Sequence, residues 1–222
     1  MLKPYEEKLK LIKSDVEKLG LDIVEALEVC LKALNERKIE NLKNVEVSEK
    51  KFLVKSNEID NLIITTLALY TPEARDLRRM VAFLKITNEM VRTAANTKDF
   101  AKMFRRSYSE DLNTNTILEY TIPLLKSALL STKTAISIID EQEHSKVEEK
   151  YQRVIVEESK TDDLYLMIEK NILKLISKNL DLSKEYFDIL SSLRRLEKIA
   201  DRAVSIANLL HFAQVGGDIV QS

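Results

Sequence analysis

The sequence predicts an all-α protein of two tandem three-helix bundles, with six long antiparallel helices, and three observations lead to this prediction. The 222 residues include only three glycines and three prolines, whereas average usage would give roughly fifteen and eleven. Folds built on β-hairpins or Gly-rich loops need many more of these turn-forming residues. Apolar residues recur every three or four positions along most of the chain, which is typical of helices with one buried face. The resulting helices fall into two sets of three.

The few helix-breaking residues divide the chain into six predicted helices. These cover about residues 4–36, 39–70, 72–105, 110–140, 145–178 and 183–214. Thr71 and Pro72 suit the start of the third helix, with Thr as N-cap and Pro at the first helical position. Ser145 and Ser183 are expected to cap the fifth and sixth helices. Pro123 lies inside the fourth, so that helix is expected to kink or to begin late.

The order of the helices indicates an internal duplication. A shift of roughly 108 residues places each of the first three helices on one of the last three. We therefore predict a first three-helix repeat over residues 1–107 and a second over residues 108–222. Helices of this length span about 50 Å at 1.5 Å per residue, and short turns would join them as antiparallel neighbours.

Composition and charge exclude several classes of protein. No run of uncharged apolar residues is long enough for a membrane span, and the charged N-terminus lacks the apolar segment of a secretory signal. The single cysteine, Cys30, excludes an internal disulfide framework and a cysteine-based zinc site. These features favour a cytoplasmic setting. With 35 Lys and Arg against 36 Asp and Glu, the chain lacks the positive charge of a dedicated nucleic-acid-binding protein.

Candidates for catalysis are few. Glu141 and His144 match one Glu-x-x-His element of the helical di-iron enzymes, but those sites need two such elements and two further glutamates. We interpret this match as a coincidence of spacing. Cys30 lies on an apolar helix stripe and is expected to pack in the core. No nucleophile or phosphate-loop motif is present, so we predict that the chain is not an enzyme.

Two pairs of acidic residues are candidate metal ligands. Glu158 and Asp162 lie on the fifth predicted helix, and Glu197 and Asp201 lie on the sixth. Spacing of i, i+4 places the two carboxylates of each pair on one helix face, about 6 Å apart. Carboxylates bind hard and borderline cations such as Mg, Mn and Fe. Because 36 acids give roughly six such pairs by chance, the spacing alone leaves open a solvated or Lys/Arg-paired face.

The third predicted helix is basic. Residues 73–107 contain nine Lys and Arg and four acids. Such a helix suits docking onto an acidic partner or an anionic surface, and the alternative is a solvated face beside acidic neighbours.

Three segments resemble signatures of the PhoU family. Residues 68–78 (ALYTPEARDLR) are similar to the family's P-x-A-x-D-L-R signature, and residues 196–207 (LEKIADRAVSIA) are similar to its L-E-R-I-A/G-D-x-A-x-N-I-A signature. Residues 156–165 (VEESKTDDLY) match the acidic element that precedes the latter. The length, the six helices and the order of these motifs extend the resemblance over essentially the whole chain.

The resemblance implies a cytoplasmic, usually dimeric adaptor with no enzymatic activity. PhoU proteins restrain the phosphate-starvation response by linking the ATPase subunit of the high-affinity phosphate transporter to a sensor histidine kinase, so contact with the membrane is only through such complexes. Two alternatives are kept open. One is an accessory scaffold of a low-affinity phosphate transporter, and the other is a metal-carboxylate enzyme.

The resemblance also implies metal binding, because family members hold clusters of iron, zinc or other metals through acid-x-x-x-Asp pairs in each repeat. In the second repeat, Glu158, Asp162, Glu197 and Asp201 are all present. In the first repeat, the equivalent positions fall at Val91 and Ala95, and at about Glu49 and Leu53. Val and Ala cannot ligate a metal. We therefore predict one iron, zinc or Mg/Mn cluster in the second repeat and none in the first.

The remaining signature residues are Pro72, Asp76, Leu77 and Arg78. Asp76 suits the N-terminal end of a helix because the helix macrodipole favours negative charge there. Arg78 could pair with Asp76 or with an acid on the second helix. These four residues are therefore expected either to support the structure or to contact a partner.

Overall fold

The computed structural model describes residues 3–216, and within them it contains six long α-helices and no strand. The helices are α1 (Lys3–Asn35), α2 (Glu49–Leu69), α3 (Ala74–Ser107), α4 (Thr114–Ser137), α5 (His144–Lys178) and α6 (Ser183–Val215). Two short 3-10 turns, η1 (Ile39–Asn44) and η2 (Leu180–Leu182), lie before α2 and α6. The predicted all-α class is confirmed.

The second helix begins ten residues later than predicted. Instead of starting at Ile39, the chain forms η1 and then runs extended to the N-cap Ser48. Ile39, Leu42 and Val47 are buried, but their spacing of three and then five residues does not follow one helix face. Val45 and Val47 are β-branched, which further disfavours a helix here.

The other helix starts are close to the predicted positions, with different caps. Glu73, not Thr71, occupies the N-cap of α3, so Pro72 precedes the helix and does not hold its first position. The N-cap of α5 is Glu143, and Ser145 lies within its first turn. Ser183 is the first residue of α6, not its cap. The fourth helix begins at Thr114, with Asn113 accepting a 3.1 Å hydrogen bond from the backbone of Thr116. Pro123 lies inside this helix, so the proline does not delay its start.

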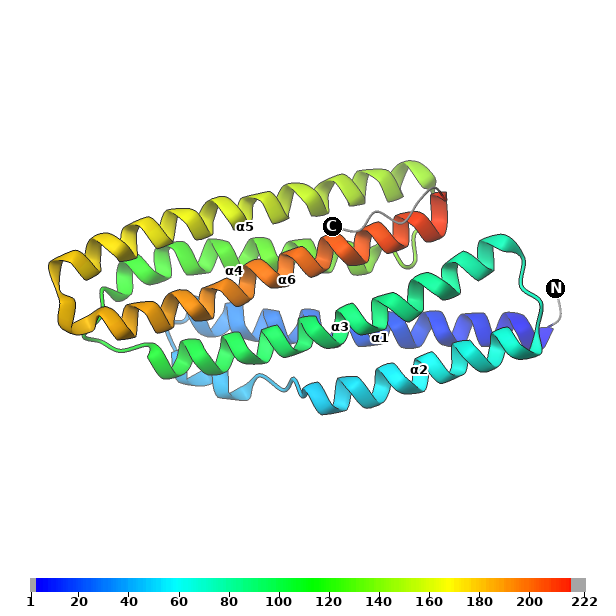
Figure 1. The fold of residues 1–222 in the computed structure, drawn as a ribbon, viewed down its shortest axis with the longest axis horizontal. Coiled ribbons are helices and arrows are strands. Elements are labelled where there is room, and N and C mark those ends of the chain that lie inside the picture. The colour runs from blue at the N-terminus through cyan, green and yellow to red at the C-terminus, as the bar shows by residue number, and fades with distance from the viewer. Residues whose placement is uncertain (1–2, 217–222) are drawn as a thin grey trace.

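Consecutive helices run antiparallel and form two layers (Figure 1). In the order α5, α6, α3 and α2, four helices lie side by side across the front face, with α4 and α1 behind them. The most extensive packing joins α3 to α6, so the last helix of each repeat forms the junction between repeats.

The two repeats share one continuous hydrophobic core. Cys30 is fully buried in it, as the sequence predicts. At the contact between α1 and α4, Gly20 allows close approach, because a Cβ there would lie only 2.9 Å from Cγ1 of Ile136. Ion pairs also cross the junction, including Arg202 to Glu89 at 3.1 Å. Between residues 3 and 216, no helix has the combination of length and apolar character that a bilayer-spanning segment requires.

Candidate metal centre

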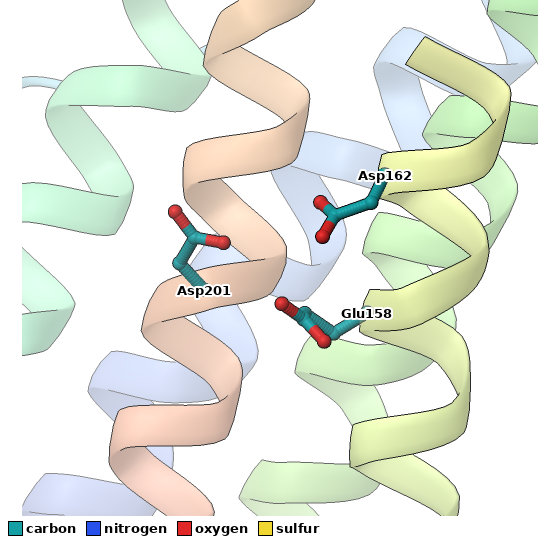
Figure 2. A group of neighbouring side chains, drawn as sticks. All are labelled: Glu158, Asp162 and Asp201. Atoms are coloured by element: carbon teal, nitrogen blue, oxygen red, sulfur yellow. The ribbon is translucent and has the colours of Figure 1, made fainter. Parts of the chain in front are cut away.

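Three of the four predicted ligands meet on the front face between α5 and α6 (Figure 2). Glu158 and Asp162 project from α5, and Asp201 projects toward them from α6. One carboxylate oxygen from each residue lies within 4.8 Å of the others. Glu158 and Asp162 are half-buried, and Asp201 is exposed. The arrangement therefore offers three oxygen ligands at a solvent-accessible position.

Helix periodicity explains why these side chains converge. On α5, the buried residues Val154, Thr161 and Tyr165 form the seam that packs into the core. Glu158 and Asp162 are one turn apart beside this seam, at its outer edge. On α6, Asp201 directly follows the buried pair Ile199 and Ala200, so its side chain stands at the corresponding edge.

Glu197, the fourth predicted ligand, lies near the group but contributes no oxygen to it. Its Oε2 is 3.8 Å from Nε of Arg194, and Arg194 is itself placed over the Tyr165 ring. This Oε2 atom is buried and has no hydrogen-bond partner. A buried carboxylate oxygen without a hydrogen-bond donor is costly. The charge of Arg194 offsets only part of the effect of burial on Glu197, and a further cation nearby would offset more of it. The residues present therefore fit a metal ion.

The raised pKa values of the acidic residues also favour a bound cation. Burial raises the pKa of Glu158, and the negative charges of Asp162, Asp201 and Glu197 raise it further. The pKa of Glu197 is raised by burial, against the opposing effect of Arg194. Burial and the charge of Asp162 raise the pKa of Asp201. Negative charge in this group is thus incompletely compensated by the protein, and a bound cation would stabilise the ionised form.

The candidate ligand atoms are all carboxylate oxygens. Such a set is typical of sites for Mg, Mn or Fe, whereas structural zinc sites typically use nitrogen and sulfur ligands. Beside the group lies an open cavity of about 220 Å³, lined by Glu158, Asp201, Arg202, Val204 and Ser205. Two of the three acidic residues thus line an opening to solvent.

Both histidines lie outside the acidic group. His211 contacts Glu148 at 2.9 Å and packs on Tyr151. Glu141 forms a 3.0 Å ion pair with Lys150, which lowers the pKa of its carboxyl to about 2. The Glu141-x-x-His144 match therefore supplies no part of the candidate centre.

The equivalent positions in the first repeat differ in part from the prediction. The buried residues of α2 and α5 correspond when the two helices are aligned with a shift of 102 residues. On α2 these are Phe52, Ile59, Ile63 and Thr66, and on α5 they are Val154, Thr161, Tyr165 and Ile168. This register makes Ser56 and Asp60 the equivalents of Glu158 and Asp162. The predicted assignment of Glu49 and Leu53 to these positions was wrong, because the connection before α2 changes the shift that relates the two repeats. Both residues are exposed.

The equivalents on α3 agree with the prediction. The buried residues of α3 and α6 correspond with a shift of 106 residues: Met90, Ala94 and Phe104 align with Leu196, Ala200 and Leu210. Val91 and Ala95 therefore align with Glu197 and Asp201. Only one carboxylate, that of Asp60, remains in this set. It accepts a 2.8 Å hydrogen bond from Oγ1 of Thr87 on α3, and burial raises its pKa.

The signature residues at the start of α3 lie in the first repeat, away from the acidic group. Asp76 is only 8% exposed and accepts a 3.3 Å hydrogen bond from Oη of Tyr5. Burial and this carboxylate raise the pKa of Tyr5 to about 12. Asp76 thus ties α1 to α3. Leu77 is exposed, and Nε of the half-buried Arg78 lacks a hydrogen-bond partner. Pro72 precedes the helix in the connection from α2.

Sequence reasoning missed the ion pairs that join the candidate centre to the first repeat. Arg202, next to Asp201, reaches Glu89 on α3, and Arg195 lies 3.9 Å from Asp99. No local pattern could have indicated these pairs, because each depends on how α3 packs against α6.

Comparison with known proteins agrees with the six-helix fold and its two repeats. A model of the PhoU domain family matches residues 16–104 and, a second time, residues 124–210. The chain belongs to the PhoU family. Its fold is similar to that of PhoU from Pseudomonas aeruginosa, with a TM-score of 0.82 and 16% identity over 96% of this chain and 100% of that one.

A second PhoU-family structure gives a similar result. The phosphate transport system regulatory protein PhoU from Streptococcus pneumoniae matches with a TM-score of 0.78 and 18% identity, over 98% of this chain and 100% of that one. A PhoU-like protein from Shewanella oneidensis matches less closely, with a TM-score of 0.62 and 14% identity over 91% and 96%. Sequence comparison with curated proteins finds no significant match. At these identities, the structural matches establish the fold.

Proposed function

We propose that this PhoU-family chain is a negative regulator of phosphate uptake and phosphate-starvation signalling that acts by contact, not catalysis. The observation that carries the proposal is the PhoU domain matched twice along one chain. The Streptococcus pneumoniae relative is described as a phosphate transport system regulatory protein. In this proposal the chain works in the cytoplasm, as a homodimer, and links the ATPase subunit of a phosphate transporter to a sensor histidine kinase.

The architecture supports action by contact. Long helices joined by short connections present extended faces, whereas catalytic residues are disproportionately carried on loops. The acidic group between α5 and α6 is the candidate functional site in this proposal. Glu158, Asp162 and Asp201 would hold the metal, and Glu197 would complete the set by a side-chain rotation away from Arg194.

When bound, a metal at this position supplies positive charge and a link between α5 and α6. The protein's own contribution is to hold three carboxylates within one ion's reach and to keep Arg202 engaged with Glu89. The front face would then be stiffer and less negative. We propose that this state is the one that binds the transporter ATPase and the kinase.

Affinity purification from phosphate-replete cells tests the adaptor function. We expect the tagged chain to recover the phosphate transporter ATPase subunit and a sensor histidine kinase, both at higher yield than from phosphate-starved cells. Recovery of neither would contradict the proposal. Recovery of a low-affinity phosphate permease instead would support the accessory-scaffold alternative.

A further inference from the structure

The first repeat presents a second, different surface on the front face. α2 and α3 lie side by side there (Figure 1), and the hydrogen bond from Thr87 to Asp60 fixes their relative rotation. On each helix, three residues spaced i, i+7 and i+11 lie along one line. We call these six residues the α2–α3 stripe: Leu53, Asp60 and Ile64 on α2, and Leu84, Val91 and Ala95 on α3.

This stripe is apolar where the second repeat is acidic. Its counterparts in the second repeat are Ile155, Asp162, Leu166, Leu190, Glu197 and Asp201. Three of these six are carboxylates, whereas Asp60 is the only acid of the α2–α3 stripe. Leu53 is 50% exposed and Ile64 is 56% exposed. The other four residues of the stripe are half-buried, so Leu53 and Ile64 are its exposed apolar side chains. Exposed apolar side chains that lie along one helix face are candidates for an interaction site.

Positive charge without ion-pair partners lies along α3. All three acids of α3 are engaged within the chain: Asp76 with Tyr5 and Arg79, Glu89 with Arg202, and Asp99 with Arg195. Six exposed cations of α3 have no ion pair within residues 3–216: Arg75, Lys85, Arg92, Lys98, Lys102 and Arg106. The α3 surface is therefore a source of positive potential that the described chain does not neutralise.

We propose that the α2–α3 stripe and its flanking cations dock an acidic, amphipathic segment of a partner protein. Apolar residues of that segment would cover Leu53, Ile64 and Val91, while its acidic residues would face Lys98 and Lys102. Complementary charge of this kind speeds association and fixes the register of an interface.

The composition of the stripe favours a protein over a membrane surface. Helices that lie on bilayers commonly insert Trp or Phe beside their basic residues. The α2–α3 stripe contains no aromatic residue, and its half-buried centre is the carboxylate of Asp60. A protein segment can place a hydrogen-bond donor against this carboxylate, which the acyl region of a bilayer cannot.

Site-specific photo-crosslinking in phosphate-replete cells tests the proposal. A photoreactive phenylalanine analogue replaces Asn88, an exposed residue one turn before Val91, and mass spectrometry identifies the crosslinked peptide. We expect a peptide from an acidic amphipathic segment. The double variant Lys98→Glu/Lys102→Glu should reduce its yield about tenfold or more.

A matched control uses Lys174→Glu/Lys178→Glu, which reverses two exposed lysines at the same spacing on α5. This control should leave the crosslink unchanged. Both double variants should retain the thermal unfolding midpoint of the wild-type protein to within a few degrees. They should also retain its metal content, because none of the four lysines belongs to the acidic group.

Each other outcome overturns the docking proposal. These outcomes are no protein crosslink, a crosslink to lipid, a crosslink to a second copy of this chain, or an adduct that persists in Lys98→Glu/Lys102→Glu. The docking proposal rests only in part on the proposed function. The identity of the crosslinked peptide tests the docking surface and the proposed partners separately. A peptide from a transporter ATPase or histidine kinase supports both, whereas an acidic segment of an unrelated protein supports the docking face and removes the proposed partners.

Discussion

The outer faces of the two repeats have the same helical framework and different chemistry. At four equivalent positions, the second repeat carries Glu158, Asp162, Glu197 and Asp201, and the first carries Ser56, Asp60, Val91 and Ala95. The buried positions behind them match helix by helix. Packing in this fold therefore depends on the buried seam, while residues at its edge vary: they are mainly acidic in one repeat and mainly uncharged in the other.

Building the missing carboxylates into the first repeat should remove this difference between the repeats. The triple variant Ser56→Glu/Val91→Glu/Ala95→Asp, with Asp60 in place, should gain a second metal site. Without metal it should lose roughly 1–3 kcal/mol of unfolding free energy, because unpaired carboxylates are placed at the buried Ser56 position and at two half-buried positions. Chemical denaturation with and without Mn²⁺, together with metal content per chain, measures both effects. No gain in metal would show that four carboxylates are not sufficient for the site.

The junction between the repeats gives the next largest effect. Gly20→Ala should lower the unfolding free energy by about 1–2 kcal/mol through overlap with Ile136, even though Ala favours a helix over Gly by about 1 kcal/mol. Adding Ile136→Val should restore part of the loss, since it removes the methyl group nearest the new Cβ. An increase in stability for Gly20→Ala alone would contradict the close approach of α1 and α4.

At the signature motif of the first repeat, Tyr5→Phe should destabilise the protein by about 1 kcal/mol, the usual contribution of one hydrogen bond. The change leaves the buried carboxylate of Asp76 without its donor on α1. Tyr120→Phe removes the 3.0 Å contact of Asn171 with the Tyr120 hydroxyl in the second repeat and serves as the control. If the two variants lose equal stability, Asp76 has no special structural role.

The smallest effect is a pH dependence of stability that arises mainly from the acidic group of the second repeat. The pKa values of Glu158, Glu197 and Asp201 are raised in the folded protein, so over that range the folded state binds more protons than the unfolded chain does. Stability without metal should therefore fall as pH rises through the ordinary carboxyl pKa toward the raised values.

Asp201→Asn removes one of these carboxylates, so it should raise the metal-free unfolding midpoint slightly at pH 7. The same variant should flatten the dependence of the midpoint on pH. Thermal unfolding between pH 4 and pH 8 in the presence of a chelator measures this. If the unfolding midpoint of Asp201→Asn depended more steeply on pH than that of the wild-type protein, repulsion among these carboxylates would not explain the raised pKa values.

Much of this structure could be predicted from sequence because the relevant signals are local. Apolar periodicity and the scarcity of Gly and Pro gave the helices, and i, i+4 spacing placed Glu158 beside Asp162. Positions that depend on three-dimensional register could not be obtained in this way. The uniform shift between repeats assigned Leu53 instead of Asp60, because the extended connection before α2 changes the register of one helix pair. The contact of Arg202 with Glu89 depends on α3–α6 packing and has no local pattern.

We expect metal to bind in the second repeat alone. Metal content per chain, measured on protein purified without chelator, tests it most directly with a matched pair of variants, Asp201→Ala and Asp60→Ala. The account predicts that Asp201→Ala loses the bound metal, while Asp60→Ala retains the wild-type stoichiometry. Unchanged stoichiometry in Asp201→Ala, or loss of metal in Asp60→Ala, would contradict it.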